Sequence, residues 1–248
     1  MRSRAESGFY HVMLRGNGRQ LIFEDDADRR EFLSCLDNAI EREGVSLIAW
    51  CLMDNHVHLI IDDPHDRLST VMYRIGMKYA MYFNNRHQRE GHLFEGRFKS
   101  SPIESDEYLV QAVRYVLNNP VAAGISTLED YRWSSYAEYC GERGLTNTKP
   151  ILDMFSSVED FVSFCREGAP VFDGKLEFDN VPDQLVKEVA TNIAIQLGCT
   201  DLSKIKALSL KRRGAIVRAL RDAGLTVNQI SRLTGISSAS LYRSLKRK

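Results

Sequence analysis

The stretch Asp54-Asn55-His56-Val57-His58-Leu59-Ile60-Ile61 reads as a short turn followed by a β-prone run that contains two histidines. Side chains at i and i+2 of a strand point to the same face, and the strand rises about 6.6 Å between them. Two imidazoles placed in this way can coordinate one ion at distances typical of Zn–N bonds, near ~2.1 Å. The stretch therefore predicts a metal site at His56 and His58. The alternative is a pair of hydrogen-bonded histidines without a metal.

The segments around this stretch alternate between strand and helix patterns. Residues 45–53 are apolar and β-prone, so the two-residue turn predicts a hairpin with the histidine strand. Further strands are expected at 9–14 and 98–103, and helices at 26–43, 68–84 and 105–119. The order βαββαβα predicts an α+β, ferredoxin-like fold, with one antiparallel four-stranded sheet and helices packed on it.

The composition limits the class of protein. With 248 residues and 44% hydrophobic content, the chain can build one large core or a core domain with a small satellite. No apolar run approaches the ~20 residues that cross a bilayer, and residues 1–7 lack a signal-peptide pattern. The five scattered cysteines include no Cys-x-x-Cys pair, which argues against a disulfide framework or a zinc ribbon. We expect a cytoplasmic protein that makes no contact with membranes.

Charge is distributed unevenly along the chain. Residues 203–248 contain 12 Lys and Arg and one acidic residue, a net charge of +11, whereas residues 1–202 carry −11. Residues 1–150 alone carry −4, which is unfavourable for an enzyme that binds DNA. The basic C-terminal segment therefore predicts a module that binds a polyanion.

The same C-terminal segment has the pattern of a helix-turn-helix. Helices are expected at 211–223, 227–233 and 238–245, with Gly235 in the tight turn. The third helix would present three side chains to a major groove, namely Ser238, Ser240 and Arg243. The alternative is a three-helix bundle with no DNA role, but the local charge favours binding of double-stranded DNA.

These patterns divide the chain into an α+β domain at 1–140, a connector with short helices at 141–180 and a basic helical domain at 181–248.

The helix expected at 105–119 has two different faces. An apolar face suits the core, and a polar face carries Tyr108, Gln111, Tyr115, Asn118 and Asn119. Tyr115 and Asn119 lie one turn apart on this polar face, where they can act as nucleophile and metal ligand. An amide oxygen suits a hard ion such as Mg²⁺ or Mn²⁺. The alternative is that the tyrosine is an ordinary amphipathic packing residue.

Five motifs occur in the order found in single-strand tyrosine transposases of the His-hydrophobic-His (HUH) type. They are Arg15-Gly16-Asn17-x-Arg19-Gln20-x-Ile22-Phe23, the histidine stretch Asp54 to Leu59, Gly91-His92-Leu93-Phe94-x-Gly96-Arg97-Phe98-Lys99, Arg114-Tyr115-Val116-x-x-Asn119-Pro120-Val121-x-Ala123-Gly124, and Tyr131-x-Trp133-Ser134-Ser135-Tyr136. The chain most resembles the REP-associated tyrosine transposases, over roughly residues 9–139. The helix-turn-helix lies outside the minimal domain of that family.

The resemblance implies a mechanism. A divalent ion, Mg²⁺ or Mn²⁺, would be held by His56, His58 and Asn119, and Tyr115 would attack a phosphodiester of a single-stranded DNA hairpin to give a 5′-phosphotyrosine. The resemblance and the charged side chains point to DNA contacts at Arg15, Asn17, Arg19, Arg97 and Lys99. We expect a nucleoid-associated protein, and the oligomeric state is open between a monomer and a homodimer.

Other functions fit the sequence less well. Histidine-triad hydrolases need a third histidine where this chain has Ile60, and metal amidohydrolases need a (β/α)₈ barrel. The remaining alternative is a catalytically quiescent, sequence-specific DNA-binding regulator that keeps the nuclease fold. The complete set His56, His58, Tyr115 and Asn119 argues against such a loss of activity.

Overall fold

The computed structural model describes residues 4–168 and then 190–191, 193–195, 197–199, 202–222, 225, 227–237 and 240–241. The chain divides into two compact units, residues 1–170 and 171–248, and each is described by itself. The first unit contains β1 (Phe9–Arg15), η1 (Asn17–Arg19), α1 (Asp26–Glu43), β2 (Ser46–Met53), β3 (His56–Asp62), α2 (Leu68–Arg86), β4 (Lys99–Ile103), α3 (Asp106–Leu117), α4 (Asn119–Ala122), α5 (Tyr136–Tyr139), α6 (Lys149–Leu152) and α7 (Val158–Arg166). Within the described residues, no helix is both long enough and apolar enough to cross a bilayer.

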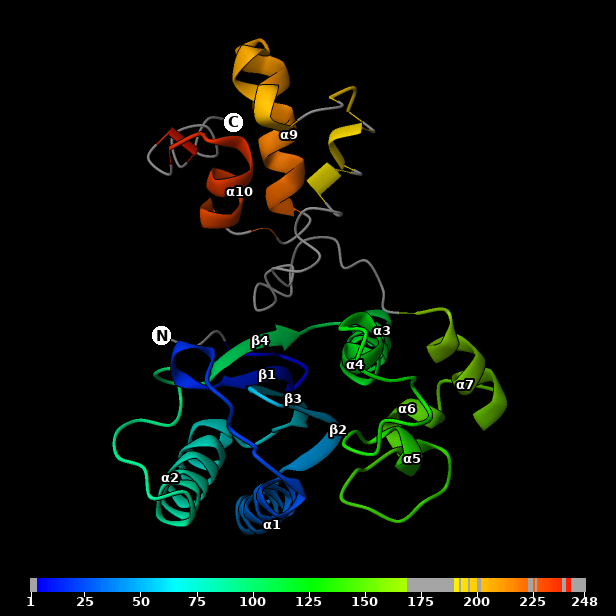
Figure 1. The fold of residues 1–248 in the computed structure, drawn as a ribbon. Coiled ribbons are helices and arrows are strands. Elements are labelled where there is room, and N and C mark those ends of the chain that lie inside the picture. The colour runs from blue at the N-terminus through cyan, green and yellow to red at the C-terminus, as the bar shows by residue number, and fades with distance from the viewer. Residues whose placement is uncertain are drawn as a thin grey trace. The chain divides into compact units, whose positions relative to one another are not determined.

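The four strands form one antiparallel sheet in the order β2-β3-β1-β4. The two-residue turn Asp54-Asn55 joins β2 and β3, as the sequence predicts. This strand order, with helices between the strands, confirms the predicted α+β, ferredoxin-like fold (Figure 1).

One face of the sheet forms the main hydrophobic core with α1 and α2, which lie together on that side (Figure 1). Alternate residues of β1, namely Tyr10, Val12 and Leu14, are buried in this core because successive side chains of a strand point to opposite faces. Helix α1 begins and ends where predicted. The Asp25 carboxylate caps it by accepting from two backbone N–H groups, and Gly44 ends it in the left-handed conformation.

Helix α3 packs on β2 and β3. Its apolar stripe is buried, and the Ser105 side chain caps it by accepting from the Tyr108 N–H group. The helix ends at Leu117, two residues earlier than predicted, because Pro120 has no N–H group to continue the hydrogen-bond ladder. Asn119 therefore starts the separate short helix α4.

The aromatic segment after α4 is attached to the edge strand β2. The Tyr131 and Tyr139 hydroxyls each donate to a β2 carbonyl, those of Leu52 and Ile48, at 2.7 Å. The segment predicted as a connector, 141–180, is described as far as residue 168. Its helix α7 buries Phe161, which stacks on the Tyr139 ring with centroids 4.6 Å apart. The predicted domain boundaries stay a prediction.

The described part of the second unit is helical and has its own hydrophobic core. It contains η2 (Leu202–Ala207), α9 (Leu210–Asp222) and α10 (Val227–Thr234). Ile230, Ile236 and Leu241 are buried in this core, and Leu233 packs against it while partly exposed. Gly235 follows α10 with φ +65°, a conformation that favours glycine in a tight turn.

A buried carboxylate joins α1 to α2. Asp28 is fully buried, and it accepts hydrogen bonds from the Glu24 N–H group at 2.8 Å, from Arg86 at 2.5 Å and from His87 at 3.0 Å. Burial by itself would raise the pKa of Asp28, but these three donors outweigh burial and lower the pKa below its usual value. The ionised carboxylate therefore stabilises the folded chain.

We expect Asp28→Asn to lower the free energy of unfolding at pH 7 by about 3 kcal/mol, because Arg86 and His87 lose the buried carboxylate and Arg86 keeps only the more exposed Asp25. A carboxyl whose folded pKa is lowered stabilises the fold above its unfolded pKa, and this contribution is lost as pH falls through the folded value. The deficit of Asp28→Asn measured by denaturant unfolding should therefore shrink in acid. Asp26→Asn, which breaks a more exposed pair with Arg29, is the control and should cost under about 1 kcal/mol. A deficit that does not depend on pH would contradict the assignment.

Candidate active site

Strand β3 presents His56 and His58 on the sheet face opposite to α1 and α2. In the register of the sheet, Met13 lies opposite His58 and Arg15 lies opposite His56, and on the other side Cys51 lies opposite His58. Directly opposite residues of an antiparallel pair share one face, so β1, β2 and β3 all contribute to the surroundings of the two histidines. The two histidine rings lie 5.0 Å apart between centroids and are nearly perpendicular.

A third histidine, His11 on β1, joins this group. His11 Nε2 and His58 Nδ1 lie 3.0 Å apart, and the two rings stack with centroids 5.2 Å apart. Both side chains are fully buried. The sequence analysis missed His11. In the sequence, His11 is marked only by its two-residue spacing from Met13 and Arg15, which places the three side chains on one strand face. That spacing points to His58 only when the register of β1 against β3 is known.

Helix α3 brings Tyr115 to the same place. The Tyr115 ring meets His58 edge-to-face with centroids 5.8 Å apart, and it meets His11 in the same way at 6.0 Å. The tyrosine is half-buried. His58, His56 and Tyr115 are thus brought together, although 57 positions separate His58 and Tyr115 in the sequence.

Asn119 lies one turn beyond Tyr115, at the start of α4. Its Nδ2 atom donates to the Tyr115 backbone carbonyl at 3.0 Å. The Asn119 side chain is half-buried. The neighbouring Asn118, expected on the polar face of the helix, is instead buried and donates to the carbonyls of Arg114 and Cys165 at 3.0 Å.

The site is electrostatically suited to a neutral imidazole. Burial, aided by the nearby Arg15 guanidinium, lowers the pKa of His58 to about 3. Burial also raises the pKa of the Cys51 thiol well above its usual value, so Cys51 is a neutral wall of the site. His58 is therefore uncharged at neutral pH, which is the form of histidine that binds metal ions.

Two loops that carry predicted DNA contacts are joined to each other. The Asn17 N–H group donates to the Leu93 carbonyl at 2.8 Å, and the Glu95 N–H group donates to the Arg15 carbonyl at 2.8 Å. Gly16 has no room for a side chain here, because a Cβ would lie 2.2 Å from the Gln20 carbonyl oxygen.

Along these loops and the adjoining strand, Arg15 is half-buried, whereas Asn17, Arg19, Arg97 and Lys99 are exposed. In the second unit, Ser240 is half-buried, and Ser238 and Arg243 lie outside the described residues.

Comparison with known proteins shows what the first unit is similar to. A sequence model of the family described as "Transposase IS200 like" matches residues 5–119. These residues therefore resemble the IS200-like transposases. A putative REP-associated tyrosine transposase of Haemophilus influenzae is 27% identical over 118 residues, which cover 43% of this chain and 67% of the relative.

Two solved structures also resemble the chain. One, described as a REP-associated tyrosine transposase bound to a REP hairpin, is 18% identical with a TM-score of 0.49 and covers 60% of this chain and 87% of its own. The other, a putative transposase from Deinococcus radiodurans, is 17% identical with a TM-score of 0.35 and covers 48% of this chain and 95% of its own.

The IS200-like domain contains His11, His56, His58 and Tyr115, and its match ends at Asn119. At the family level these proteins are transposases, enzymes that process DNA. Among groups of three or more His, Cys, Asp or Glu side chains, none within the described residues could hold a metal ion.

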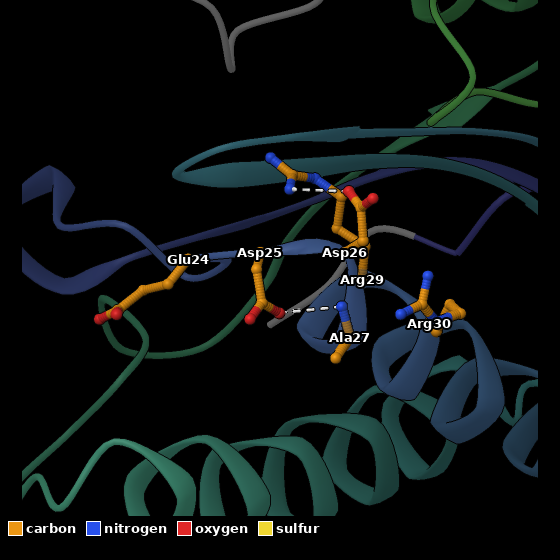
Figure 2. Close-up of a pocket in the computed structure, with 6 residues that line it drawn as sticks. All are labelled: Glu24, Asp25, Asp26, Ala27, Arg29 and Arg30. Atoms are coloured by element: carbon orange, nitrogen blue, oxygen red, sulfur yellow. Dashed lines mark hydrogen bonds and ion pairs between the residues drawn. The ribbon is translucent and has the colours of Figure 1, made fainter.

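A pocket at the start of α1 contains none of the predicted site residues (Figure 2). It is lined by Glu24, Asp25, Asp26, Ala27, Arg29 and Arg30. Figure 2 shows two interactions among these residues: Asp25 accepts from the Ala27 N–H group at 2.9 Å, and Asp26 pairs with Arg29 at 4.0 Å.

Helix α7 lies outside the IS200-like match and supports the tyrosine helix. Arg114, next to Tyr115, donates to the Phe164 carbonyl at 3.2 Å and pairs with Glu167, and Asn118 donates to the Cys165 carbonyl. The C-terminal end of α3 is thus fixed to α7 on the side away from the histidines.

We expect Asn118→Ala to lower the free energy of unfolding of the first unit by about 1–2 kcal/mol, because one buried and one partly buried hydrogen bond are lost. Denaturant unfolding of the full chain measures this. Glu167→Gln removes only an exposed ion pair with Arg114 and should cost well under about 1 kcal/mol. Equal costs for the two variants would show that α7 does not anchor α3 through Asn118.

Proposed function

We propose that this chain cuts and rejoins single-stranded DNA through a covalent bond to Tyr115. The observation that carries the proposal is the meeting of the Tyr115 ring with the His58 ring, at 5.8 Å, inside a domain that resembles the IS200-like transposases. The resemblance to REP-associated tyrosine transposases supports a hairpin-bearing single strand as the substrate.

A divalent ion fits the residues present. His56 and His58 leave the same strand face with ring centroids 5.0 Å apart, and His58 is neutral because it is buried. The Asn119 amide keeps its Oδ1 atom for an ion, since its Nδ2 atom donates to the Tyr115 carbonyl. We propose these three side chains as ligands of Mg²⁺ or Mn²⁺, which when bound polarises the phosphodiester and stabilises the negative charge that develops on it.

Tyr115 provides the nucleophile. Its phenolic oxygen forms a bond to phosphorus, and the bond from phosphorus to the 3′-oxygen breaks. The phenol proton passes to solvent, and the departing 3′-oxygen takes a proton to become a 3′-hydroxyl. A phenol has an ordinary pKa near ~10, so Tyr115 must lose its proton as it attacks at neutral pH. Helices α3 and α7 hold the ring in place, and this reduces the entropy that the attack must lose.

The same bond allows rejoining. The 5′-phosphotyrosine keeps the energy of the broken phosphodiester, so a second 3′-hydroxyl can attack phosphorus and release the Tyr115 phenol. No ATP is consumed in either step. The activity is therefore strand transfer rather than simple hydrolysis.

The joined loops give the DNA a place to bind beside the site. We propose that the exposed side chains of Asn17, Arg19, Arg97 and Lys99 contact the phosphate backbone, with Arg15 nearest to His56. The basic second unit supplies further affinity for DNA, because residues 203–248 carry a net charge of +11 and Arg212 and Arg218 on α9 are exposed.

We expect Tyr115→Phe to abolish the covalent protein–DNA adduct and to leave DNA binding within about threefold, because only the nucleophilic oxygen is removed. The measurement is denaturing gel electrophoresis of the full chain after incubation with Mn²⁺ and a labelled pool of hairpin-bearing single strands. The matched control is Tyr108→Phe, on the same side of α3, which should still form the adduct. An adduct in Tyr115→Phe would exclude Tyr115 as the nucleophile, and binding without any adduct in the wild type would favour a quiescent regulator.

We expect the double variant Arg212→Gln and Arg218→Gln to weaken DNA binding and to reduce the slope of log affinity against log salt by about 2, because each lost phosphate contact removes about one released counterion. Fluorescence anisotropy across a salt series measures the slope. The matched control is Arg143→Gln with Lys149→Gln, two exposed cations of the first unit. Equal slopes for the wild type and the α9 variant would refute a role for the second unit in holding DNA.

A further inference from the structure

We propose that His11 is a positioning residue, which fixes the ring nitrogen that His58 offers to the metal ion. The inference rests on the proposed function above, since it assigns to His11 a role toward a metal that His58 would bind. It concerns a side chain outside the predicted ligand set, on a different strand from the two ligand histidines.

The geometry of the pair is that of a hydrogen bond between two stacked imidazoles. His11 Nε2 and His58 Nδ1 lie 3.0 Å apart, and the ring planes differ by 15°. Neither ring is exposed to solvent. The pair is therefore shielded from competition by water.

A neutral imidazole carries one N–H donor and one nitrogen lone pair, and only the nitrogen with the lone pair can bind a metal ion. If His58 Nδ1–H donates to His11 Nε2, the lone pair of His58 is fixed on Nε2. His11 then carries its own proton on Nδ1. We assign this direction of donation because the opposite direction would place the His58 proton on Nε2. The Nδ1 lone pair would then accept from His11, and neither nitrogen of His58 would have a lone pair for the proposed ion.

The second ligand histidine shows the same arrangement with a different partner. His56 Nδ1 lies 2.7 Å from Asn55 Oδ1, and an amide oxygen can only accept. The proton of His56 is therefore on Nδ1 and its lone pair is on Nε2. His11 does for His58 what Asn55 does for His56, so that both rings offer the same nitrogen. Partners of this kind around a metal typically account for 10–100-fold in metal affinity.

The burial of His11 supports a specific role for its imidazole ring. His11 lies on β1 among buried side chains and also meets Tyr115, where an apolar side chain would pack with no polar atoms to satisfy. A histidine at this position adds the hydrogen bond to His58 that an apolar residue lacks.

The test compares His11→Gln with His11→Leu in the full chain. Glutamine places an acceptor oxygen at about the position of the His11 Nε2 atom, and leucine fills the space without an acceptor. Two readouts are independent of activity: Mn²⁺ affinity, from the electron paramagnetic resonance signal of free Mn²⁺, and the tautomer of His58, from long-range ¹⁵N–¹H spectra of the histidine rings. Thermal unfolding of each variant confirms that it is folded.

We expect wild type and His11→Gln to bind Mn²⁺ within about threefold of each other, with His58 protonated on Nδ1. His11→Leu should bind Mn²⁺ about 10–100-fold more weakly and lose the single His58 tautomer. A folded His11→Leu with unchanged Mn²⁺ affinity and tautomer would overturn the proposal. So would a loss in His11→Gln as large as that in His11→Leu, because it would show that the hydrogen bond is not what matters.

A separate variant tests the metal site of the proposed function. His58→Ala should abolish the Mn²⁺ binding that the wild type shows. Unchanged binding in His58→Ala, or no binding in the wild type, would overturn the proposed metal site. In either case the His58 tautomer in wild type and in His11→Leu would still decide whether His11 fixes the ring.

Discussion

Pairing of β1 with β3 places Met13 opposite His58 and Arg15 opposite His56, and the candidate site depends on this register. A slip of one residue would turn every side chain of β1 to the other face. His11 would then leave His58 and enter the core against α1 and α2, and Tyr10, Val12 and Leu14 would replace it beside the histidines. The apolar core on one face thus helps to fix the polar site on the other, because burial of those three residues excludes a slip of one residue.

One face of the sheet forms the hydrophobic core, and the other carries the candidate site. The face under α1 and α2 is apolar and carries the large hydrophobic core. The opposite face carries three histidines, and the two that are fully buried, His11 and His58, meet the half-buried tyrosine of α3. Buried polar side chains cost free energy unless they are hydrogen-bonded, so the site needs the surrounding structure to hold it. Helix α7 and the aromatic segment provide that support from residues beyond the IS200-like match.

Negative and positive charge are concentrated in different parts of the chain. Residues 1–202 carry a net charge of −11 and residues 203–248 carry +11. A negatively charged domain gains little from general attraction to phosphates, so the DNA contacts that we propose for it are local, at the loops joined through Asn17 and Leu93. The second unit has a separate hydrophobic core and exposed arginines.

Much of this could be predicted from local patterns. The period of two in β3, the apolar stripe of α1 and the caps at Asp25 and Ser105 act over a few residues, so the sequence determines them directly. The predicted site residues His56, His58 and Tyr115 also follow from periodicity and motif spacing. The burial of Asn118 and the place of His11 were decided by tertiary structure. They depend on α7 and on strand register, which bring together groups that are far apart in the sequence.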